Sequence, residues 1–356
     1  MGNFGKKASL NDLQNQPKKP KSAVRKPVNI ASNLLIFLGI GFLLASLAFF
    51  LIQKPSFISP LNFSRQKIDY SPYSFKALTN REYFKSEIRL ERVLEEKPNY
   101  TSYLFSFAAD GRRITGMANL PKKEGKLPAA ILLRGWVDEK IYQTGMGSKN
   151  MAAFLAENGF VTLAPDFLGY GGSDSAFPDM LQTRFFRPIT VISLLNSVFS
   201  LPQADPDKMV IWAHSNGGQI ALSVLEITQK EIPTSLWAPV SAPFPESILF
   251  FASEMEDEGR LIRTTIGDFE KKYSFADFSI ETGYQKISAP LLLHQGLADE
   301  SIPFQWSDQL AEDLKNLKKE VTYYRYPNEN HNFTQGSAPT VRARDLRFFK
   351  KQLEIN

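Results

Sequence analysis

The residues with the clearest chemical potential lie in a short run near residue 215. The apolar segment Met209–Ala213 leads directly into His-Ser-Asn-Gly, and the helix-forming segment Gln219–Ile227 follows. A serine between small residues on a tight strand-to-helix turn projects its hydroxyl out of a sheet, which is the geometry of a nucleophile elbow. The alternative is an ordinary turn in which Ser215 caps the helix. The spacing favours Ser215 as a nucleophile.

An acid and a base that could serve this nucleophile follow later in the chain. Asp299 lies just beyond the predicted strand Pro290–His294, in the kind of loop where the sites of α/β folds gather. Its alternative roles are a surface carboxylate or a helix cap. Glu300 is a neighbouring rival, but its side chain should point away from that of Asp299. His331 follows the predicted strand Val321–Tyr326 in a polar loop.

Elimination identifies the base, because the chain has only three histidines. We expect His214, next to Ser215, to turn into the core. We expect His294, inside a strand, to be packed and hydrogen-bonded locally. His331 is then the general base, and the order Ser215, Asp299, His331 is that of α/β-hydrolases rather than of chymotrypsin or subtilisin. With three histidines and no cysteine, no metal site is expected.

The segment 132–137, Leu-Leu-Arg-Gly-Trp-Val, lies at the end of an earlier predicted strand. Acyl transfer to a serine requires two backbone N–H donors at the developing oxyanion. We expect one from Asn216, just after the nucleophile, and the other from Trp136, with Gly135 allowing a close approach. The alternative for Trp136 is plain core packing.

Arg134 in the same segment has two interpretations. Its planar guanidinium could bind an anionic group of the substrate in bidentate fashion. Alternatively, it could form a structural ion pair with a nearby acid such as Asp166 or Asp174. Arg134 and Gly135 are therefore candidate substrate-binding residues.

The elements that position these residues alternate between strand and helix. A hairpin around Asp110-Gly111 comes first, with strands Tyr103–Phe107 and Arg113–Leu120. The later strand candidates are Ala129–Leu133, Phe160–Ala164, Met209–Ala213, Thr234–Ala238, Pro290–His294 and Val321–Tyr326. The helix candidates are Lys149–Asn158, Thr190–Phe199, Gln219–Ile227, Phe304–Leu317 and Val341–Leu353. This alternation predicts an α/β fold, a mostly parallel sheet with helices on both faces.

Residues 242–283 interrupt this pattern with an aromatic, acidic stretch that contains nine acids and four bases. We interpret the stretch as a helical cap over the site, and a surface insertion without function is the alternative. Residues 54–98 read as a linker and an N-terminal extension, in which segment 79–97 has helical spacing.

The N-terminus concentrates the positive charge. Residues 1–29 carry seven basic residues and one acid, a net charge of +6. Since the net charge of the whole chain is +5, the other residues together carry −1. A nearly neutral body argues against nucleic-acid binding. Hydrophobic residues at 43% and charged residues at 22% exclude a wholly disordered chain, whereas the tail itself is too polar to fold.

Residues 34–52 read LLIFLGIGFLLASLAFFLI, without a charge. As a helix rising about 1.5 Å per residue, they would span roughly 28 Å, close to the hydrocarbon thickness of a bilayer. We predict a transmembrane helix over 30–53; a cleaved signal peptide and a buried core helix are the alternatives. The basic tail places the N-terminus in the cytoplasm and the body outside it.

From about Tyr103 to Leu353 the sequence resembles the α/β-hydrolase superfamily, specifically the catalytic domain of prolyl oligopeptidase-type serine peptidases and related esterases. The motifs that carry the resemblance, besides the serine run, are Leu163–Ser173 (Leu-Ala-Pro-Asp-Phe-Leu-Gly-Tyr-Gly-Gly-Ser) and Leu201–Met209. In the first, Asp166 is interpreted as a residue that organises the loop. Two departures are Arg134, where such enzymes usually have His, and Ala213, where they usually have Gly.

The resemblance implies an α/β-hydrolase domain over 99–356, and the apolar stretch 34–52 separately predicts one transmembrane helix before it. The expected function is a membrane-anchored, extracytoplasmic serine hydrolase that cleaves an ester or a peptide bond without metal or organic cofactor. The family's large peptidases carry a β-propeller, for which the segment before the domain has no room, so a small-molecule ester remains as compatible as a peptide. An acyltransferase and a catalytically silent binding protein on the same fold are the alternatives.

Overall fold

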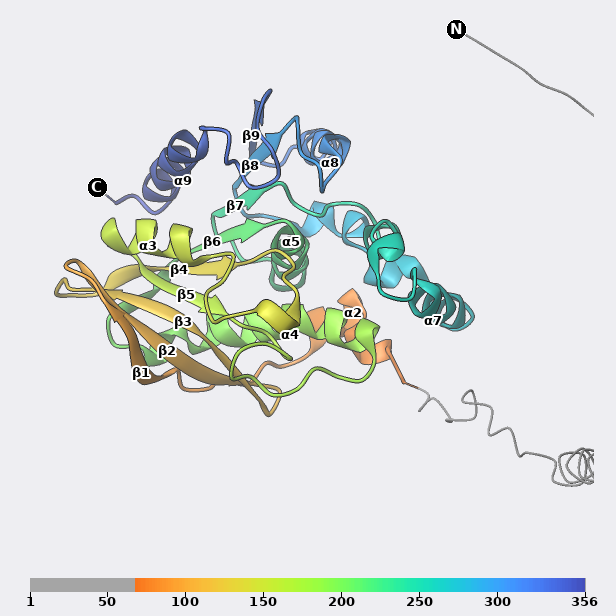
Figure 1. Cartoon of the computed structure of the whole chain (residues 1–356), viewed down its shortest axis with the longest axis horizontal. Helices are drawn as coiled ribbons and strands as arrows, with labels where there is room; N and C mark the ends of the chain where they lie inside the picture. Colours follow the sequence, from red (N-terminus) through yellow and green to blue (C-terminus); the bar gives the residue numbers. More distant parts are fainter. Residues whose placement is uncertain (1–67, 356) are drawn as a thin grey trace, which may run out of the picture. The chain divides into compact units, whose positions relative to one another are not determined.

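The computed structural model describes residues 68–355, and a nine-stranded sheet runs through them (Figure 1). The strand order is β1-β2-β3-β5-β4-β6-β7-β8-β9. The strands are β1 (Arg89–Glu96), β2 (Tyr100–Ala109), β3 (Arg112–Pro121), β4 (Leu127–Leu133), β5 (Val161–Pro165), β6 (Ala204–His214), β7 (Thr234–Trp237), β8 (Leu291–Gly296) and β9 (Val321–Tyr326). From β5 to β9 neighbouring strands pair in parallel, and β1, β2 and β3 add an antiparallel edge. The predicted mostly parallel sheet is confirmed.

The predicted hairpin joins β2 to β3 through a two-residue turn. Asp110 and Gly111 both have positive φ, 46° and 74°. Ala109 pairs directly with Arg112 across the turn. Two consecutive residues of left-handed conformation are what a tight hairpin between twisted strands requires, and Asp-Gly is a favoured pair for it.

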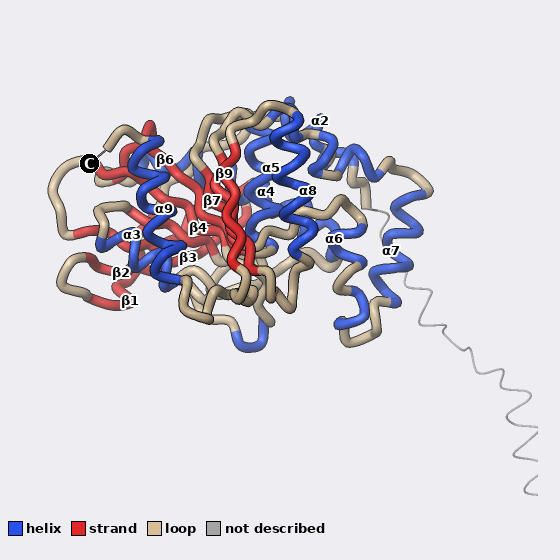
Figure 2. The backbone as a smooth tube through the Cα atoms, turned by 90° about the horizontal axis from the view of Figure 1, so that it is seen from above, coloured by secondary structure: helices blue, strands red, loops and turns tan. Residues whose placement is uncertain are grey.

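Helices cover both faces of the sheet (Figure 2). The helices are α2 (Phe75–Asn80), α3 (Lys149–Glu157), α4 (Met180–Ser197), α5 (Asn216–Thr228), α6 (Glu246–Leu249), α7 (Arg260–Glu270), α8 (Phe304–Asn316) and α9 (Ala338–Gln352). Residues of α4, α5 and α8 form one apolar core with one face of the sheet, and residues of α3 and α9 form a second core on the other. In β4, Ile131 and Leu133 join the first core while Ala130 and Leu132 join the second. This alternation explains why the central strands read as unbroken apolar runs.

The segment with helical spacing before the hairpin contains a strand instead. Residues 89–96 form β1, which pairs with β2 at the edge of the sheet. The apolar residues of this segment are spaced as in a helix. The segment forms a strand because it pairs with β2, and such pairing is not visible in the local sequence. The compact unit begins at Ile68, and Leu78 and Ile88 lie in its main core, so the described part of the predicted extension 54–98 is built into the hydrolase body.

The insertion predicted over 242–283 lies between β7 and β8 and contains α6, α7 and several 3₁₀ turns. Its aromatic residues form a third apolar cluster, together with the start of α4 and with Tyr70. Phe269 is central, because its ring contacts those of Phe185, Phe244 and Tyr70. The aromatic residues of the insertion therefore form a small core together with α4 and Tyr70.

The predicted tail 1–29 and the predicted transmembrane helix 30–53 lie outside the described residues. Within residues 68–355, no helix combines the length and the apolar character needed to cross a bilayer.

Candidate active site

The carboxyl ends of the parallel strands bring the predicted site residues to one edge of the sheet. Ser215 follows β6, Asp299 follows β8 and His331 follows β9, while Gly135 and Trp136 follow β4. These positions explain how residues up to 196 positions apart in the chain can converge on one place.

Ser215 lies on a strained turn between β6 and α5, with φ 55° and ψ −121°. Its N–H donates to the carbonyl of Trp237 at 2.9 Å, and its carbonyl accepts from the N–H of Val240 at 2.9 Å. These bonds to the last residue of β7 and to the segment after it hold a backbone conformation that a serine rarely adopts. Such strain is commonly found at functional sites.

The small residues after Ser215 are required by close packing. A Cβ on Gly217 would lie 2.1 Å from the carbonyl oxygen of Leu133, and a Cβ on Gly218 would lie 2.4 Å from Cβ of Pro239. Both distances are far below van der Waals contact. The tight strand-turn-helix predicted around Ser215 is therefore present, and Ala213 before it is fully buried in β6.

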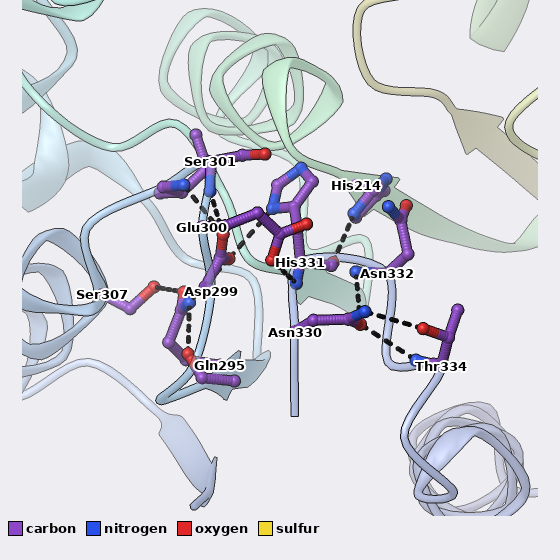
Figure 3. Close-up of polar contacts among 12 residues, drawn as sticks. His214, Gln295, Asp299, Glu300, Ser301, Ser307, Asn330, His331, Asn332 and Thr334 are labelled. Atoms are coloured by element: carbon purple, nitrogen blue, oxygen red, sulfur yellow. Dashed lines mark hydrogen bonds and ion pairs between the residues drawn. The ribbon is translucent and has the colours of Figure 1, made fainter. Parts of the chain in front are cut away.

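His331 and Asp299 are directly hydrogen-bonded, with His331 Nδ1 2.9 Å from Asp299 Oδ2 (Figure 3). Asp299 Oδ1 accepts the N–H groups of Ser301 and Ile302 at 2.9 and 2.8 Å, and Oδ2 also accepts Gln295 Nε2 at 2.9 Å. Burial raises the pKa of Asp299, but the hydrogen bond from His331 and the two backbone donors outweigh it and leave this pKa below its usual value. The carboxylate is held ionised and correctly oriented.

The rival acid Glu300 has a different role. Its Oε2 accepts the backbone N–H of His331 at 3.2 Å. Glu300 thus fastens the loop that carries His331, while Asp299 contacts the ring, so both carboxylates bind the same histidine.

His214 is buried, but its ring lies against His331, and the expectation of a purely core position was incomplete. The two ring centroids are 4.6 Å apart, and His214 Nε2 lies 3.0 Å from the carbonyl oxygen of His331. A carbonyl only accepts, so His214 Nε2 carries the hydrogen. Burial, followed by the nearby His331, lowers the pKa of His214 to about 4, which keeps the ring neutral.

His294 is packed and hydrogen-bonded locally, as predicted. Its Nδ1 lies 2.8 Å from the hydroxyl of Tyr326 and its Nε2 lies 3.0 Å from Asp345 Oδ1. The carboxylate of Asp345 also accepts Ser235 Oγ and Trp237 Nε1. Since His294, Ser235 and Asp345 have no solvent exposure, this second histidine–aspartate pair is closed to substrate.

The loop after β4 approaches Ser215 closely. A Cβ on Gly135 would lie 3.0 Å from Ser215 Cβ and 3.5 Å from Ser215 Oγ. Trp136 is 70% exposed, so the alternative of core packing is wrong. Asn216 is the first residue of α5, where backbone N–H groups have no acceptor within the helix. Both predicted oxyanion donors therefore belong to segments next to the serine.

Arg134 is buried between aromatic rings rather than extended towards open space. Its Nη1 donates to the carbonyl of Gly135 at 2.9 Å and its Nη2 to the carbonyl of Asp166 at 3.0 Å. The guanidinium carbon lies 4.1 Å from the ring centroid of Tyr170 and 4.4 Å from that of Tyr142. These contacts give Arg134 a structural role in shaping the loop beside the serine.

The predicted ion pair of Arg134 with Asp166 or Asp174 does not form among the described residues. The carboxylate of Asp166 accepts three hydroxyl groups, those of Thr115, Tyr142 and Thr144. Burial raises the pKa of Asp166 above its usual value despite these bonds. Asp174 accepts the backbone N–H of Arg113 at 2.8 Å. Asp166 organises its loop as predicted, but its main-chain carbonyl, not its carboxylate, contacts Arg134.

Between residues 68 and 355, no hydrogen bond joins Ser215 Oγ to the His331 ring, and such contacts are often long until substrate binds. In the same range, no three residues among His, Asp and Glu are grouped so that they could hold a metal ion.

The sheet, the serine between β6 and α5, and the acid and histidine after β8 and β9 define an α/β-hydrolase, and the protein is a serine hydrolase. Residues 147–356, more than half of the chain, match the model of the prolyl oligopeptidase family, Peptidase_S9. The chain belongs to this family.

Two relatives show how the similarity is distributed. The uncharacterized peptidase YtmA of Bacillus subtilis (strain 168) is 26% identical over 235 residues, 65% of this chain and 86% of the relative. The dipeptidyl aminopeptidase BIII of Pseudoxanthomonas mexicana is 24% identical over 264 residues, 68% of this chain but 37% of that larger protein.

Two solved structures share the fold. Acetyl xylan esterase 1 from Thermoanaerobacterium sp. JW/SL YS485 superposes with a TM-score of 0.58 at 18% identity, over 80% of this chain and 93% of that one. A puromycin-hydrolyzing peptidase of Mycobacterium tuberculosis gives a TM-score of 0.56 at 17% identity, over 73% of this chain and 41% of that one. An esterase and a peptidase are thus equally near in architecture.

Proposed function

We propose that this protein is a membrane-anchored serine hydrolase that cleaves an ester or amide bond outside the cytoplasm through Ser215, His331 and Asp299. The observation that carries the catalytic part is the hydrogen bond between His331 Nδ1 and Asp299 Oδ2, formed at the sheet edge where Ser215 lies on its strained turn. The anchor is supported by the uncharged stretch 34–52 and the basic residues before it.

In the first half of the reaction, His331 Nε2 takes the proton of the Ser215 hydroxyl while Ser215 Oγ attacks the substrate carbonyl carbon. Asp299 accepts Nδ1–H of the ring and stabilises the imidazolium that results. The tetrahedral intermediate places its negative oxygen towards the backbone N–H groups of Asn216 and Trp136. His331 then gives its proton to the leaving alcohol or amine, and an acyl-enzyme remains on Ser215.

In the second half, His331 takes a proton from a water molecule, whose oxygen attacks the acyl carbon. Collapse of the second tetrahedral intermediate returns the proton from His331 to Ser215 Oγ and releases the acid. The reaction consumes the substrate and one water molecule and regenerates Ser215 and His331, so no further reactant is needed.

A fluorophosphonate probe tests the nucleophile. The full-length chain should be labelled and should hydrolyse p-nitrophenyl acetate, and S215A should lose both, with a fall in kcat of about 10⁴-fold or more. H331A and D299N should fall to a similar level, and combining them with S215A should not multiply the loss, because the three residues act as a unit.

The matched control is S253A, which removes an exposed serine of the insertion and should keep full labelling. Labelling that persists in S215A would remove Ser215 as the nucleophile. A well-folded wild-type chain that is neither labelled nor active would instead favour a silent binding protein on this fold.

A further inference from the structure

Two arginines of α4 line a small pocket next to the nucleophile segment. Arg184 and Arg187 are three residues apart, so their side chains leave the same face of the helix. The pocket has a cavity volume of about 30 Å³, and its other walls include Tyr73, Asn216 and Phe278. Since about 10–15 Å³ of such volume holds one water molecule, the space suits a group of a few heavy atoms.

The pocket combines elements that are far apart in the chain. Tyr73 comes from the segment before α2, Asn216 opens α5, and Phe278 belongs to the insertion 242–283. Because Asn216 directly follows Ser215, the pocket begins at the residue that is expected to supply an oxyanion donor. A group bound there would be part of a molecule that reaches the serine.

Neither arginine of the pocket is paired with a carboxylate of residues 68–355. Arg184 Nη2 donates to two neutral oxygens, Gln219 Oε1 and Ser247 Oγ. Arg187 forms neither a hydrogen bond nor an ion pair with any residue between 68 and 355. The hydroxyl of Tyr170 and the positive charge of Arg134 also act on Arg187, in opposite directions, and neither supplies a carboxylate.

This arrangement is unfavourable for the protein alone. Loss of hydration lowers the pKa of Arg184 to about 9, and the nearby Arg187 lowers it further. Loss of hydration also lowers the pKa of Arg187 to about 10, with a smaller contribution from Arg134 that Tyr170 opposes. Half-buried cations without an acidic partner destabilise a fold, and groups in such states are typical of sites that bind something. Arg184 has a structural use in joining α4 to α5 and the insertion, but Arg187 has none.

We propose that Arg184 and Arg187 bind a carboxylate of the substrate, so that the enzyme prefers esters or amides that carry a second, anionic end. The planar guanidinium forks match the two oxygens of a carboxylate, and the aromatic walls suit the apolar stem of such a molecule. The inference rests on the proposed function, because it assigns the substrate class of the same site.

The experiment compares two p-nitrophenyl esters on the full-length chain, a hemiglutarate with a free carboxylate and its neutral methyl ester. The wild type should favour the hemiglutarate in kcat/KM, and R187Q should reduce this preference roughly 10- to 100-fold, the usual effect of losing a charge-assisted hydrogen bond. R187K, which keeps a charge but not the fork, should retain part of it.

The matched control is R263Q, which removes the same charge from an exposed position on α7 and should keep the preference. Because Arg187 has no partner to lose, R187Q should melt at the temperature of the wild type or higher. Free glutarate should raise the melting temperature of the wild type and of S215A, but not that of R187Q.

The outcomes distinguish a failure of the carboxylate pocket from a failure of the proposed hydrolase function. Active enzyme without preference for the hemiglutarate, together with no stabilisation by glutarate, would overturn the carboxylate pocket and leave the hydrolase intact. The same would follow if R263Q lost the preference as strongly as R187Q, or if inorganic phosphate stabilised the wild type while glutarate did not. Absence of fluorophosphonate labelling with glutarate binding preserved would refute the hydrolase instead.

Discussion

At the residue scale, the contact between His214 and His331 shows how the base is held. His331 is positioned from three sides: Asp299 bonds its ring, Glu300 accepts its backbone N–H, and His214 donates to its carbonyl. The last contact requires a hydrogen on His214 Nε2, and burial lowers the pKa of His214 to about 4, so the ring donates this bond in its neutral form.

We therefore expect H214A to lower kcat about 10-fold, because one of the bonds that fix the His331 loop is lost. H214N should recover part of the loss, since an amide can donate to the same carbonyl. The pH profile of kcat/KM should keep its acid limb, because the low pKa of His214 leaves its ring neutral over the physiological range. An acid limb displaced by about one unit would show that His214 acts through charge.

The sequence could reveal residues whose signals are local. Ser215, Asp299 and His331 each follow a strand that reads clearly, and their order in the chain is informative by itself. The role of Glu300, the stacking of Arg134 and the pairing of Arg184 with Arg187 were not visible, because each depends on contacts between segments that are distant in sequence. A hint was present in α4, where two arginines occur three positions apart and are the only charged residues of the helix.

At the element scale, strands with a clear local sequence signal were predicted, and the strand that depends on a distant contact was not. β9 was predicted to its terminal residues, and β7 and β8 to within two residues, because each is a compact run of apolar or β-branched side chains. Only the second half of α4 was predicted. The first half contains two arginines and a proline, which interrupt the apolar helical pattern. β1 was not predicted, because its exposed, charged residues carry no buried pattern and its pairing with β2 is a contact that local sequence does not reveal.

Helix α5 carries a second unusual group, the carboxyl of Glu226, which is 1% exposed. Within the described part of the chain neither of its oxygens has a hydrogen-bond partner. A Cβ on Gly283 would lie 2.3 Å from Oε2, so only glycine allows the side chain to lie there. Burial, and then the nearby Glu281, raises the pKa of Glu226 well above its usual value. Folding therefore takes up a proton, and stability decreases as the pH rises from the unfolded pKa towards the folded one.

Replacing this group by an apolar side chain of similar shape should stabilise the fold. We expect E226M to gain about 1–3 kcal/mol at about pH 8 and much less at about pH 4, where the carboxyl is protonated in both states. Denaturant unfolding at the two pH values measures the difference. E231M, at an exposed position after the helix, should show no gain at either pH. An equal gain of E226M at both pH values would contradict an ionisation effect.

At the scale of the whole molecule, the membrane proposal can be tested separately from catalysis. Fusions of alkaline phosphatase and of β-galactosidase to the C-terminus should behave oppositely in bacteria. The phosphatase fusion should be active and the galactosidase fusion inactive, because seven basic residues before residues 30–53 hold the N-terminus in the cytoplasm.

A chain lacking residues 1–53 and given no other export signal should reverse both results. An active galactosidase fusion of the full-length chain would place the hydrolase body in the cytoplasm. That result would leave the assignments of Ser215, Asp299 and His331 untouched, because they depend only on the described residues.

The charged edge strand β1 affects how readily copies of this chain can associate through their sheets. Sheet edges with free backbone groups invite edge-to-edge association between copies. β1 places Arg89, Glu91, Arg92, Glu95 and Glu96 along this edge, and its register with β2 shifts twice, between Leu90 and Arg92 and between Val93 and Glu95. Charges and irregular pairing both oppose docking of a further strand. If the chain is anchored in a membrane as proposed, its copies would encounter one another often. The charges and the irregular pairing of β1 would then oppose edge-to-edge aggregation during these encounters.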